Sequence, residues 1–160
     1  MKEVLKFIIN TVTFFISIVT VILLILYVIG IVPTVISSGS MEPAIPTGSL
    51  CMINRNYPFE KIKVNDIIVY YQPEQKVIHR VVKVSEQDVR TKGDANDFVD
   101  RLRATKNNYY GKFMFSVPQV GYFLIPFQST PGKIIFAMVI ILLYIDFYIL
   151  NRKEKQNGNN

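Results

Sequence analysis

Cysteine and charged residues are scarce in this sequence, and each shortage excludes a class of protein. Cys51 is the only cysteine, so neither a disulfide framework nor a metal site built from four cysteines can form within the chain. Charged residues make up 19% of the chain, below the roughly 25% that is usual in soluble domains. Half of the residues are hydrophobic, and this much apolar surface requires burial, which excludes an intrinsically disordered chain.

The longest stretch without charge lies near the N-terminus, between Lys6 and Glu42. Within it, residues 7–32 are mostly Phe, Ile, Val and Leu, and they exceed the roughly 20 residues that a membrane span requires. A cleaved secretory signal is the alternative, but its apolar region is usually only about 7–15 residues long. The sequence therefore predicts a transmembrane helix over 7–32, whose few polar side chains can bond back to the helix backbone.

A second apolar run covers residues 134–150 and is interrupted only by Asp146. This length is at the lower limit for a membrane span. It predicts a second transmembrane helix over 133–150, although an apolar helix that lies on the membrane or packs on the domain is the alternative.

Basic residues lie before the first apolar run and after the second, and they indicate how the chain is oriented in the membrane. Cytoplasmic segments of membrane proteins carry an excess of Lys and Arg. We therefore expect cytoplasmic tails at 1–6 and 151–160, the last residues of the chain being disordered, and an extracytoplasmic domain over 33–132. Isoleucine is abundant, which favours a bacterial plasma membrane over an endoplasmic reticulum. The basic residues concerned are Lys2, Lys6, Arg152, Lys153 and Lys155.

The segment 33–132 consists of short runs rich in β-branched and aromatic residues, separated by polar turns. No amphipathic helix of ten or more residues is predicted there. The fold predicted is a membrane-anchored, mainly-β domain with an antiparallel sheet, flanked by N-terminal and C-terminal transmembrane helices. The predicted strands are Ser49–Ile53, Asp66–Tyr71, Lys76–Val84, Asp88–Lys92 and Phe113–Val117.

Two apolar features of this segment have simple interpretations. Cys51 lies in an apolar strand and is expected to be a small buried hydrophobic residue. Residues 113–127 are either core and linker or an apolar rim that dips into lipid headgroups. Acidic and basic residues nearly balance, and no basic stripe with aromatic residues occurs, so nucleic-acid binding is not expected.

Three groups of residues could carry chemistry, and each is weak by itself. The serines of Ser37–Ser40 follow the first apolar run and could be a linker. His79 is the only histidine; a structural role is common, but histidine is also the side chain best suited to act as a base near neutral pH. The loop 93–101 holds Asp94 and Asp100, either as a solvated turn or as a partner for His79.

Together these groups resemble signal peptidase I of the endoplasmic-reticulum and archaeal type, which some Gram-positive bacteria also have. The segment Ser37–Pro43 resembles the nucleophile box, residues 66–82 resemble the strand pair that ends in the base, and residues 91–101 resemble the acidic box. The three boxes occur in order at compatible spacing, and the resemblance covers most of 33–132. One small departure is Ala95, where the family often has Asn.

The resemblance implies a role for each matching residue. Ser40 matches the nucleophile, and His79 stands where other bacterial signal peptidases have a lysine base. Asp100 is favoured as the third member of the triad, with Asp94 as the alternative. Ser38 matches the serine whose hydroxyl assists the backbone N–H of Ser40 in the oxyanion hole. No metal or organic cofactor is implied.

The function expected is therefore a membrane-bound serine endopeptidase that removes signal peptides after small residues of the Ala-x-Ala kind. Its partners would be preproteins and membrane lipid, with additional subunits left open. The substrate is expected to lie extended beside Val35, Ile36, Ser37 and Ser38. The alternatives are a non-catalytic β domain that binds a partner, a lipase-like hydrolase, for which the Gly-x-Ser-x-Gly pattern is absent, and a Ser/Lys peptidase.

Overall fold

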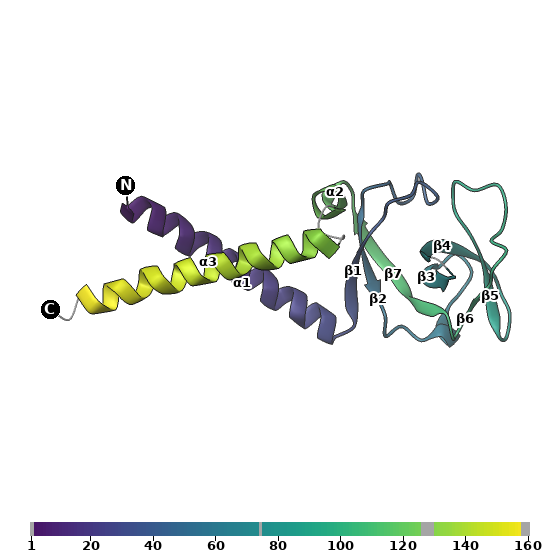
Figure 1. Cartoon of the computed structure of the whole chain (residues 1–160). Helices are drawn as coiled ribbons and strands as arrows, with labels where there is room; N and C mark the ends of the chain where they lie inside the picture. Colours follow the sequence, from purple (N-terminus) through teal and green to yellow (C-terminus); the bar gives the residue numbers. More distant parts are fainter. Residues whose placement is uncertain (1, 74, 126–129, 158–160) are drawn as a thin grey trace. The chain divides into compact units, whose positions relative to one another are not determined.

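The computed structural model describes residues 2–73, 75–125 and 130–157 (Figure 1). The chain divides into two compact units. One is formed by residues 26–125, and the other contains the two terminal segments, 1–25 and 126–160.

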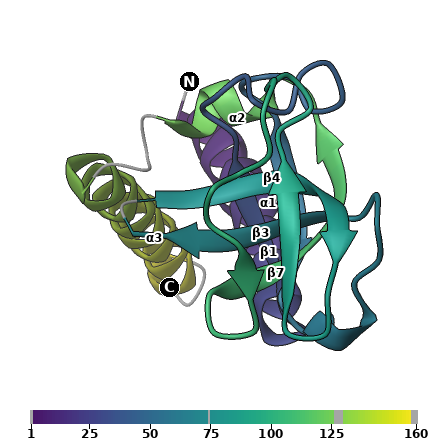
Figure 2. The same ribbon diagram turned by 90° about the vertical axis from the view of Figure 1, so that its right-hand side faces the viewer.

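The unit 26–125 is built on one seven-stranded sheet with the strand order β1-β2-β7-β3-β4-β5-β6. Every neighbouring pair is antiparallel, and Figure 2 shows β3 beside β4. The predicted mainly-β domain with an antiparallel sheet is confirmed. The strands are β1 (Ile31–Val35), β2 (Leu50–Asn54), β3 (Ile67–Gln72), β4 (Gln75–Val84), β5 (Asp88–Lys92), β6 (Ala104–Thr105) and β7 (Tyr109–Val117).

Apart from residues 26–28, which end a longer helix, helical structure among the described residues of this unit is limited, as expected, to two short pieces. They are the 3-10 turn η1 (Phe59–Lys61) and the helix α2 (Val120–Leu124). The strand predicted at residues 113–117 is real but begins earlier, since β7 starts at Tyr109. Gly111 within β7 lies against the Asn54 carbonyl, where a Cβ atom would come within 2.7 Å of that oxygen.

The first strand corrects the helix boundary expected from the sequence. The helix α1 (Lys2–Val28) ends four residues before Val32, and Ile31–Val35 form β1. The physical reason is Gly30, which adopts a φ of 82° and donates its N–H to the carbonyl of Tyr27. Such a left-handed glycine is a common helix terminus. The unbroken apolar composition concealed this change from helix to strand.

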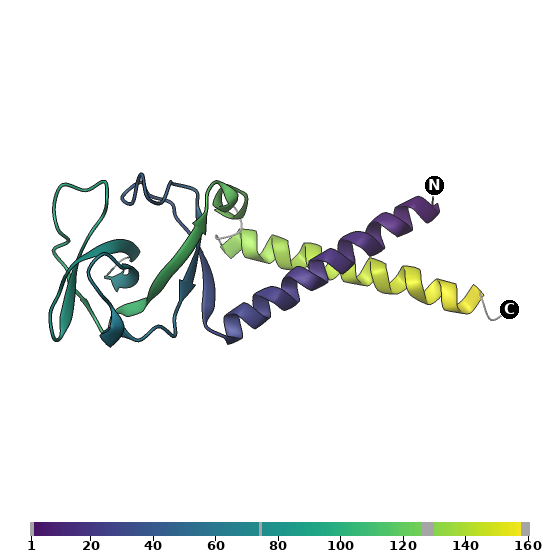
Figure 3. The same cartoon turned by 180° about the vertical axis from the view of Figure 1, so that it is seen from behind.

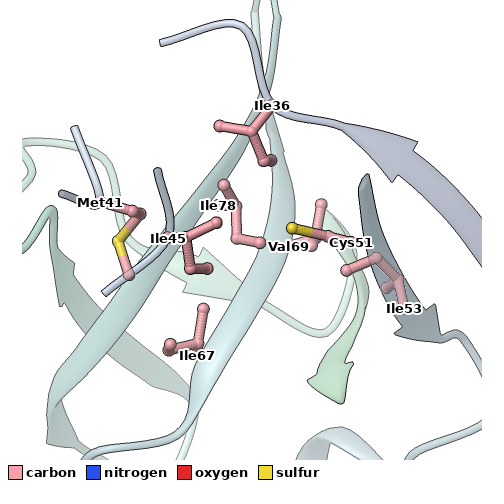
Figure 4. Packing of buried hydrophobic residues seen from close by; sticks show 8 residues of the cluster. All are labelled: Ile36, Met41, Ile45, Cys51, Ile53, Ile67, Val69 and Ile78. Atoms are coloured by element: carbon pink, nitrogen blue, oxygen red, sulfur yellow. The ribbon is translucent and has the colours of Figure 1, made fainter. Parts of the chain in front are cut away.

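Buried side chains line both faces of the central strands and form two clusters. In β3, Ile67 and Val69 belong to the first cluster, whereas Ile68 and Tyr70 belong to the second. This follows from the alternation of side chains along a strand. The first cluster, drawn in Figure 4, consists of Ile36, Met41, Ile45, Cys51, Ile53, Ile67, Val69 and Ile78. Cys51 is fully buried, as predicted.

The terminal unit contains most of α1 and the helix α3 (Thr130–Asn157), each a continuous helix in Figure 3. The hydroxyls of Ser17 and Thr20 donate to the carbonyls four residues earlier, which confirms the expected bonds to the helix backbone. Ser17 Oγ also lies 3.0 Å from the Tyr144 hydroxyl.

The two helices differ in their fitness to cross a membrane. Among the described residues, only α1 contains a stretch long and apolar enough, Lys6–Val28, whereas the apolar part of α3, Ile134–Ile149, is shorter. Residues 156 and 157, expected in a disordered tail, belong to α3. The run of Arg, Lys and Glu before them has high helix propensity. Residues 158–160 of that tail lie outside the described residues.

Candidate active site

Ser40 lies in a loop between β1 and β2 that is anchored in the core on both sides. Ile36 precedes it and is 5% exposed, while Met41 and Ile45 follow it and are essentially buried (Figure 4). Burying each such side chain contributes roughly 1.5–3 kcal/mol. The backbone N–H of Ala95 donates to the Ser40 carbonyl at 3.0 Å. These contacts fix the Ser40 backbone while its hydroxyl stays accessible.

Further hydrogen bonds brace the same loop beyond Ser40. The Glu42 N–H donates to the Gly39 carbonyl, and the Thr47 hydroxyl donates to Oε1 of Glu42 at 2.7 Å. The bonds from Thr47 lower the pKa of Glu42. Gly93 faces the loop from the other side, and a Cβ there would lie 2.6 Å from the Ser40 carbonyl oxygen, so only glycine fits.

Ser40, His79 and Asp100 form a continuous hydrogen-bonded row. His79 Nε2 lies 3.1 Å from Ser40 Oγ, and His79 Nδ1 lies 2.6 Å from Asp100 Oδ2. With the hydrogen on Nδ1 donated to Asp100, Nε2 is free to accept the hydrogen of Ser40. The side chains of His79 and Asp100 are only 9% and 10% exposed, so water competes little for these bonds.

The environment of Asp100 favours its charged form. Burial alone would raise its pKa, but hydrogen bonds from His79 and Thr91, helped by Tyr70, lower the pKa below its usual value. An ionised carboxylate in this position can orient the imidazole and stabilise its cation.

Asp94, the alternative partner expected for His79, pairs with Arg80 instead. Its two carboxylate oxygens accept from Nε and Nη2 of Arg80 at 2.8 and 2.7 Å. This bidentate pair has a geometric reason, because adjacent residues of a strand point to opposite faces of the sheet. His79 and Arg80 therefore face in opposite directions, and each meets a different aspartate of the loop 93–101.

Ser38 lies beside Ser40, as the sequence led us to expect. The two hydroxyl oxygens are 3.4 Å apart, near the outer limit for a hydrogen bond. Ser38 is exposed and Ser40 partly exposed, and both line the same groove.

The groove has a volume of about 410 Å³ and includes every residue expected to contact substrate. Its walls come from β1 with the loop that follows it, from β3, from β4 and from the loop before Asp100. The lining residues are Thr34, Val35, Ile36, Ser37, Ser38, Ser40, Val69, Gln72, Gln75, Lys76, Val77, Ile78, His79, Asn96 and Asp100.

The wall from β4 was missed by sequence reasoning. Residues 75–79 pair with β3, but pairing with β5 begins only at Arg80, so one edge of this part of β4 carries no strand partner in the described sheet. β1 likewise pairs only with β2. The sequence did contain a signal for this wall. The predicted strand that holds His79 begins before it, so the residues that precede His79 lie close to the groups that His79 contacts.

Among the described residues, no group of three or more His, Cys, Asp or Glu side chains could hold a metal ion. Cys51 lies outside the row of Ser40, His79 and Asp100, and burial raises the pKa of its thiol to about 11.

Comparison with known proteins assigns the family. Residues 8–109 match the model of "Signal peptidase, peptidase S26". The chain is 31% identical over 134 residues to the signal peptidase complex catalytic subunit SEC11C of Rattus norvegicus, covering 75% of this chain and 67% of the relative. It is 32% identical over 127 residues to SEC11 of Colletotrichum graminicola, covering 68% and 73% respectively.

A bacterial relative is similar over a shorter segment. Signal peptidase I W of Bacillus subtilis is 30% identical over 87 residues, which cover 51% of this chain and 46% of the relative. The chain belongs to the signal peptidase family, peptidase S26. It is a peptidase that removes signal peptides, and its resemblance to the endoplasmic-reticulum and archaeal type of signal peptidase I is confirmed.

Proposed function

We propose that this signal peptidase cleaves by a serine mechanism in which Ser40 is the nucleophile, His79 the general base and Asp100 the residue that orients His79. The observation that carries the proposal is the unbroken row of hydrogen bonds from Ser40 Oγ through both nitrogens of His79 to Asp100. A nucleophile within hydrogen-bond reach of a base that is itself oriented is the arrangement expected for acyl transfer.

The reaction follows from these positions. His79 Nε2 takes the proton of Ser40 as Oγ bonds to the scissile carbonyl carbon, and the same proton then passes to the leaving amine nitrogen. Water, deprotonated in turn by His79, hydrolyses the acyl-enzyme and restores Ser40. The Ser40 backbone N–H and the Ser38 hydroxyl stabilise the oxyanion, where one donor is typically worth about 2.7–4 kcal/mol.

The groove supports recognition of an extended substrate. β1 and residues 75–79 of β4 each present a strand edge to it, so a substrate segment can hydrogen-bond to backbone on either side. Val35 and Ile36, with Ile78, provide apolar walls close to Ser40. This combination suits small side chains of the Ala-x-Ala kind before the cleaved bond.

Membrane attachment is part of the same proposal. The helix α1 crosses the membrane, and the apolar part of α3 forms a second, shorter span that brings both tails to the cytoplasmic side. Residues 33–132 then face outward from the plasma membrane, where preproteins emerge. Exposed apolar residues of α2, including Phe123 at 78% exposure, form a rim for contact with lipid headgroups. Residues 126 and 127 of the expected rim lie outside the described residues.

The test is incubation of the purified, detergent-solubilised chain with a preprotein that carries an Ala-x-Ala site. Mass spectrometry of the products should give one cut directly after the second alanine, and the Ser40→Ala variant should give none. An uncut preprotein would favour the alternative of a domain that binds without cutting. Equal cleavage by the Ser40→Ala variant would exclude Ser40 as the nucleophile.

A further inference from the structure

One carboxylate oxygen of Asp100 receives three side-chain hydrogen bonds. Besides His79 Nδ1 at 2.6 Å, Oδ2 accepts from Thr91 Oγ1 at 2.7 Å and from the Tyr70 hydroxyl at 3.1 Å. Tyr70 and Thr91 are completely buried. Two buried hydroxyls therefore hold this oxygen in place in addition to His79.

These hydroxyls are themselves held in place. Gln72 Nε2 donates to the Tyr70 oxygen at 3.0 Å, and Thr91 Oγ1 lies 3.0 Å from the same oxygen. Because Tyr70 already accepts from Gln72, its own hydrogen is available for Asp100, as is the single hydrogen of Thr91. The bonds thus run in one direction, from the amide of Gln72 through the phenol to the carboxylate.

The donors come from the sheet, whereas Asp100 comes from a loop. Tyr70 and Gln72 lie on β3, His79 on β4 and Thr91 on β5. The loop around Asp100 has little apolar anchorage, since Phe98 is 82% exposed and its other large apolar side chains also face solvent. Apart from the backbone bond from the Asp100 N–H to the Thr91 carbonyl, polar side-chain contacts fix the carboxylate. Its position therefore depends on the hydroxyls behind it.

We propose that Tyr70 and Thr91 are positioning residues that aim Oδ2 of Asp100 at His79 and limit how strongly this oxygen attracts the imidazole hydrogen. The proposal rests on the serine mechanism proposed above. During the reaction the proton of Ser40 moves to His79 Nε2 and on to the leaving amine, while Asp100 stays ionised. Hydrogen bonds from both hydroxyls spread the negative charge of the carboxylate, so the imidazolium gives up its proton more readily.

Other charged side chains also lie near this network. Lys76 of β4 lines the same groove, and the pair of Arg80 with Asp94 adjoins His79 on the opposite face of the strand. In the contacts described above, neither Lys76 nor Arg80 nor Asp94 forms a hydrogen bond with Asp100. A change in the pH dependence of cleavage on removal of the Tyr70 or Thr91 hydroxyl is therefore attributable to Asp100.

The experiment compares Tyr70→Phe and Thr91→Val with the unmodified chain, by measuring kcat and KM on a signal-peptide substrate between pH 5 and 9. We expect kcat to fall on the order of tenfold, KM to stay within about twofold, and the acid limb of kcat/KM to move to higher pH. The reason is that Asp100 with one donor fewer binds the imidazolium more strongly. Thr91→Ser, which keeps the hydroxyl, should restore both kcat and the acid limb.

Tyr109→Phe is the matched control, since it removes a second phenol from the same sheet, that of the partly buried Tyr109. The Tyr109 hydroxyl is buried without a hydrogen-bond partner in the described structure, so its loss should leave kcat and the pH profile unchanged. Thermal unfolding of each variant identifies any that fail to fold.

The inference is overturned if folded Tyr70→Phe keeps full kcat, if the loss lies in KM alone, or if the acid limb stays in place or moves to lower pH. Failure of the serine mechanism itself is distinguishable, because the Ser40→Ala variant would then still cleave.

Discussion

His79 Nε2 and Ser40 Oγ stand 3.1 Å apart although 39 positions separate the two residues in the chain. The contact joins an accessible loop serine to a strand histidine that is 7% exposed. The loop cannot drift far from the strand, because Met41, next to Ser40, shares a buried cluster with Ile78, next to His79. The core packing therefore sets the distance between the two reactive side chains.

The first prediction concerns these two side chains. Ser40→Ala and His79→Ala should each lower kcat for preprotein cleavage by roughly 10⁴-fold or more, since removal of either member disables a triad. Both variants should still insert into membranes and unfold at nearly the temperature of the unmodified chain. Steady-state kinetics and thermal unfolding in the same detergent provide the measurement, and full activity in either variant would contradict the assignment.

The second prediction separates the two aspartates. Asp100→Ala should lose about 10⁴-fold in kcat, because His79 loses the partner that orients it. Asp94→Ala should lose less activity but about 1–3 kcal/mol of stability, because Arg80 is left without its bidentate partner. Parallel measurements of kcat and of the free energy of unfolding test this, and a reversed order of activities would move the triad role to Asp94.

The third prediction concerns acid pH. Cleavage should decline on acidification below neutrality, because a protonated His79 cannot accept the proton of Ser40. The pKa of Asp100 is lowered in the folded protein, so its contribution to stability is present above the ordinary value of about 3.9 and is lost as pH falls through the lowered pKa. Between pH 7 and 5 the activity should therefore fall while this contribution to stability persists.

Its measurement pairs kcat/KM with thermal unfolding across the same pH range. Activity that stays constant down to pH 5 would count against His79 as the base. Loss of the fold in parallel with loss of activity would show that acid unfolding, and not titration of the base, limits cleavage.

The fourth prediction concerns the single thiol. Burial raises the pKa of Cys51 to about 11, so almost no thiolate exists at pH 8 and N-ethylmaleimide should not label the folded protein. Labelling should appear after denaturation, as read by mass spectrometry. Cys51→Ala should retain cleavage, since the sulfur packs in the core and takes no part in the hydrogen bonds that join Ser40, His79 and Asp100. Rapid labelling of the folded chain would contradict its burial.

The fifth prediction tests the lipid-contacting rim. Phe123→Glu places a charge on an exposed apolar surface and should reduce cleavage of a membrane-bound preprotein severalfold, with little change for a soluble peptide. Val64→Glu is the control, since Val64 is also exposed, at 51%, but lies in a turn outside α2. Equal losses on both substrates, or equal losses in both variants, would remove the rim from the proposal.

Much of the fold was readable from local patterns. Short runs rich in β-branched and aromatic residues, bounded by polar turns, predicted β2, β3, β4 and β5 within a residue or two, because such side chains pack well on a sheet and turn residues mark where strands end. β1 was missed since its residues continue the apolar composition of α1, and the boundary is set by the left-handed Gly30. Because α1 and β1 are both apolar, composition does not show where the backbone changes from helix to strand.

The site, like the fold, was only partly predictable from the sequence. The sequence by itself determined which chemistry was available, because it holds one histidine, a serine cluster after an apolar run and two aspartates in one loop. Only the tertiary structure decided which aspartate meets the histidine. Side chains alternate along β4, so His79 and Arg80 face opposite sides of the sheet, and the folded loop brings Asp100 to the first and Asp94 to the second.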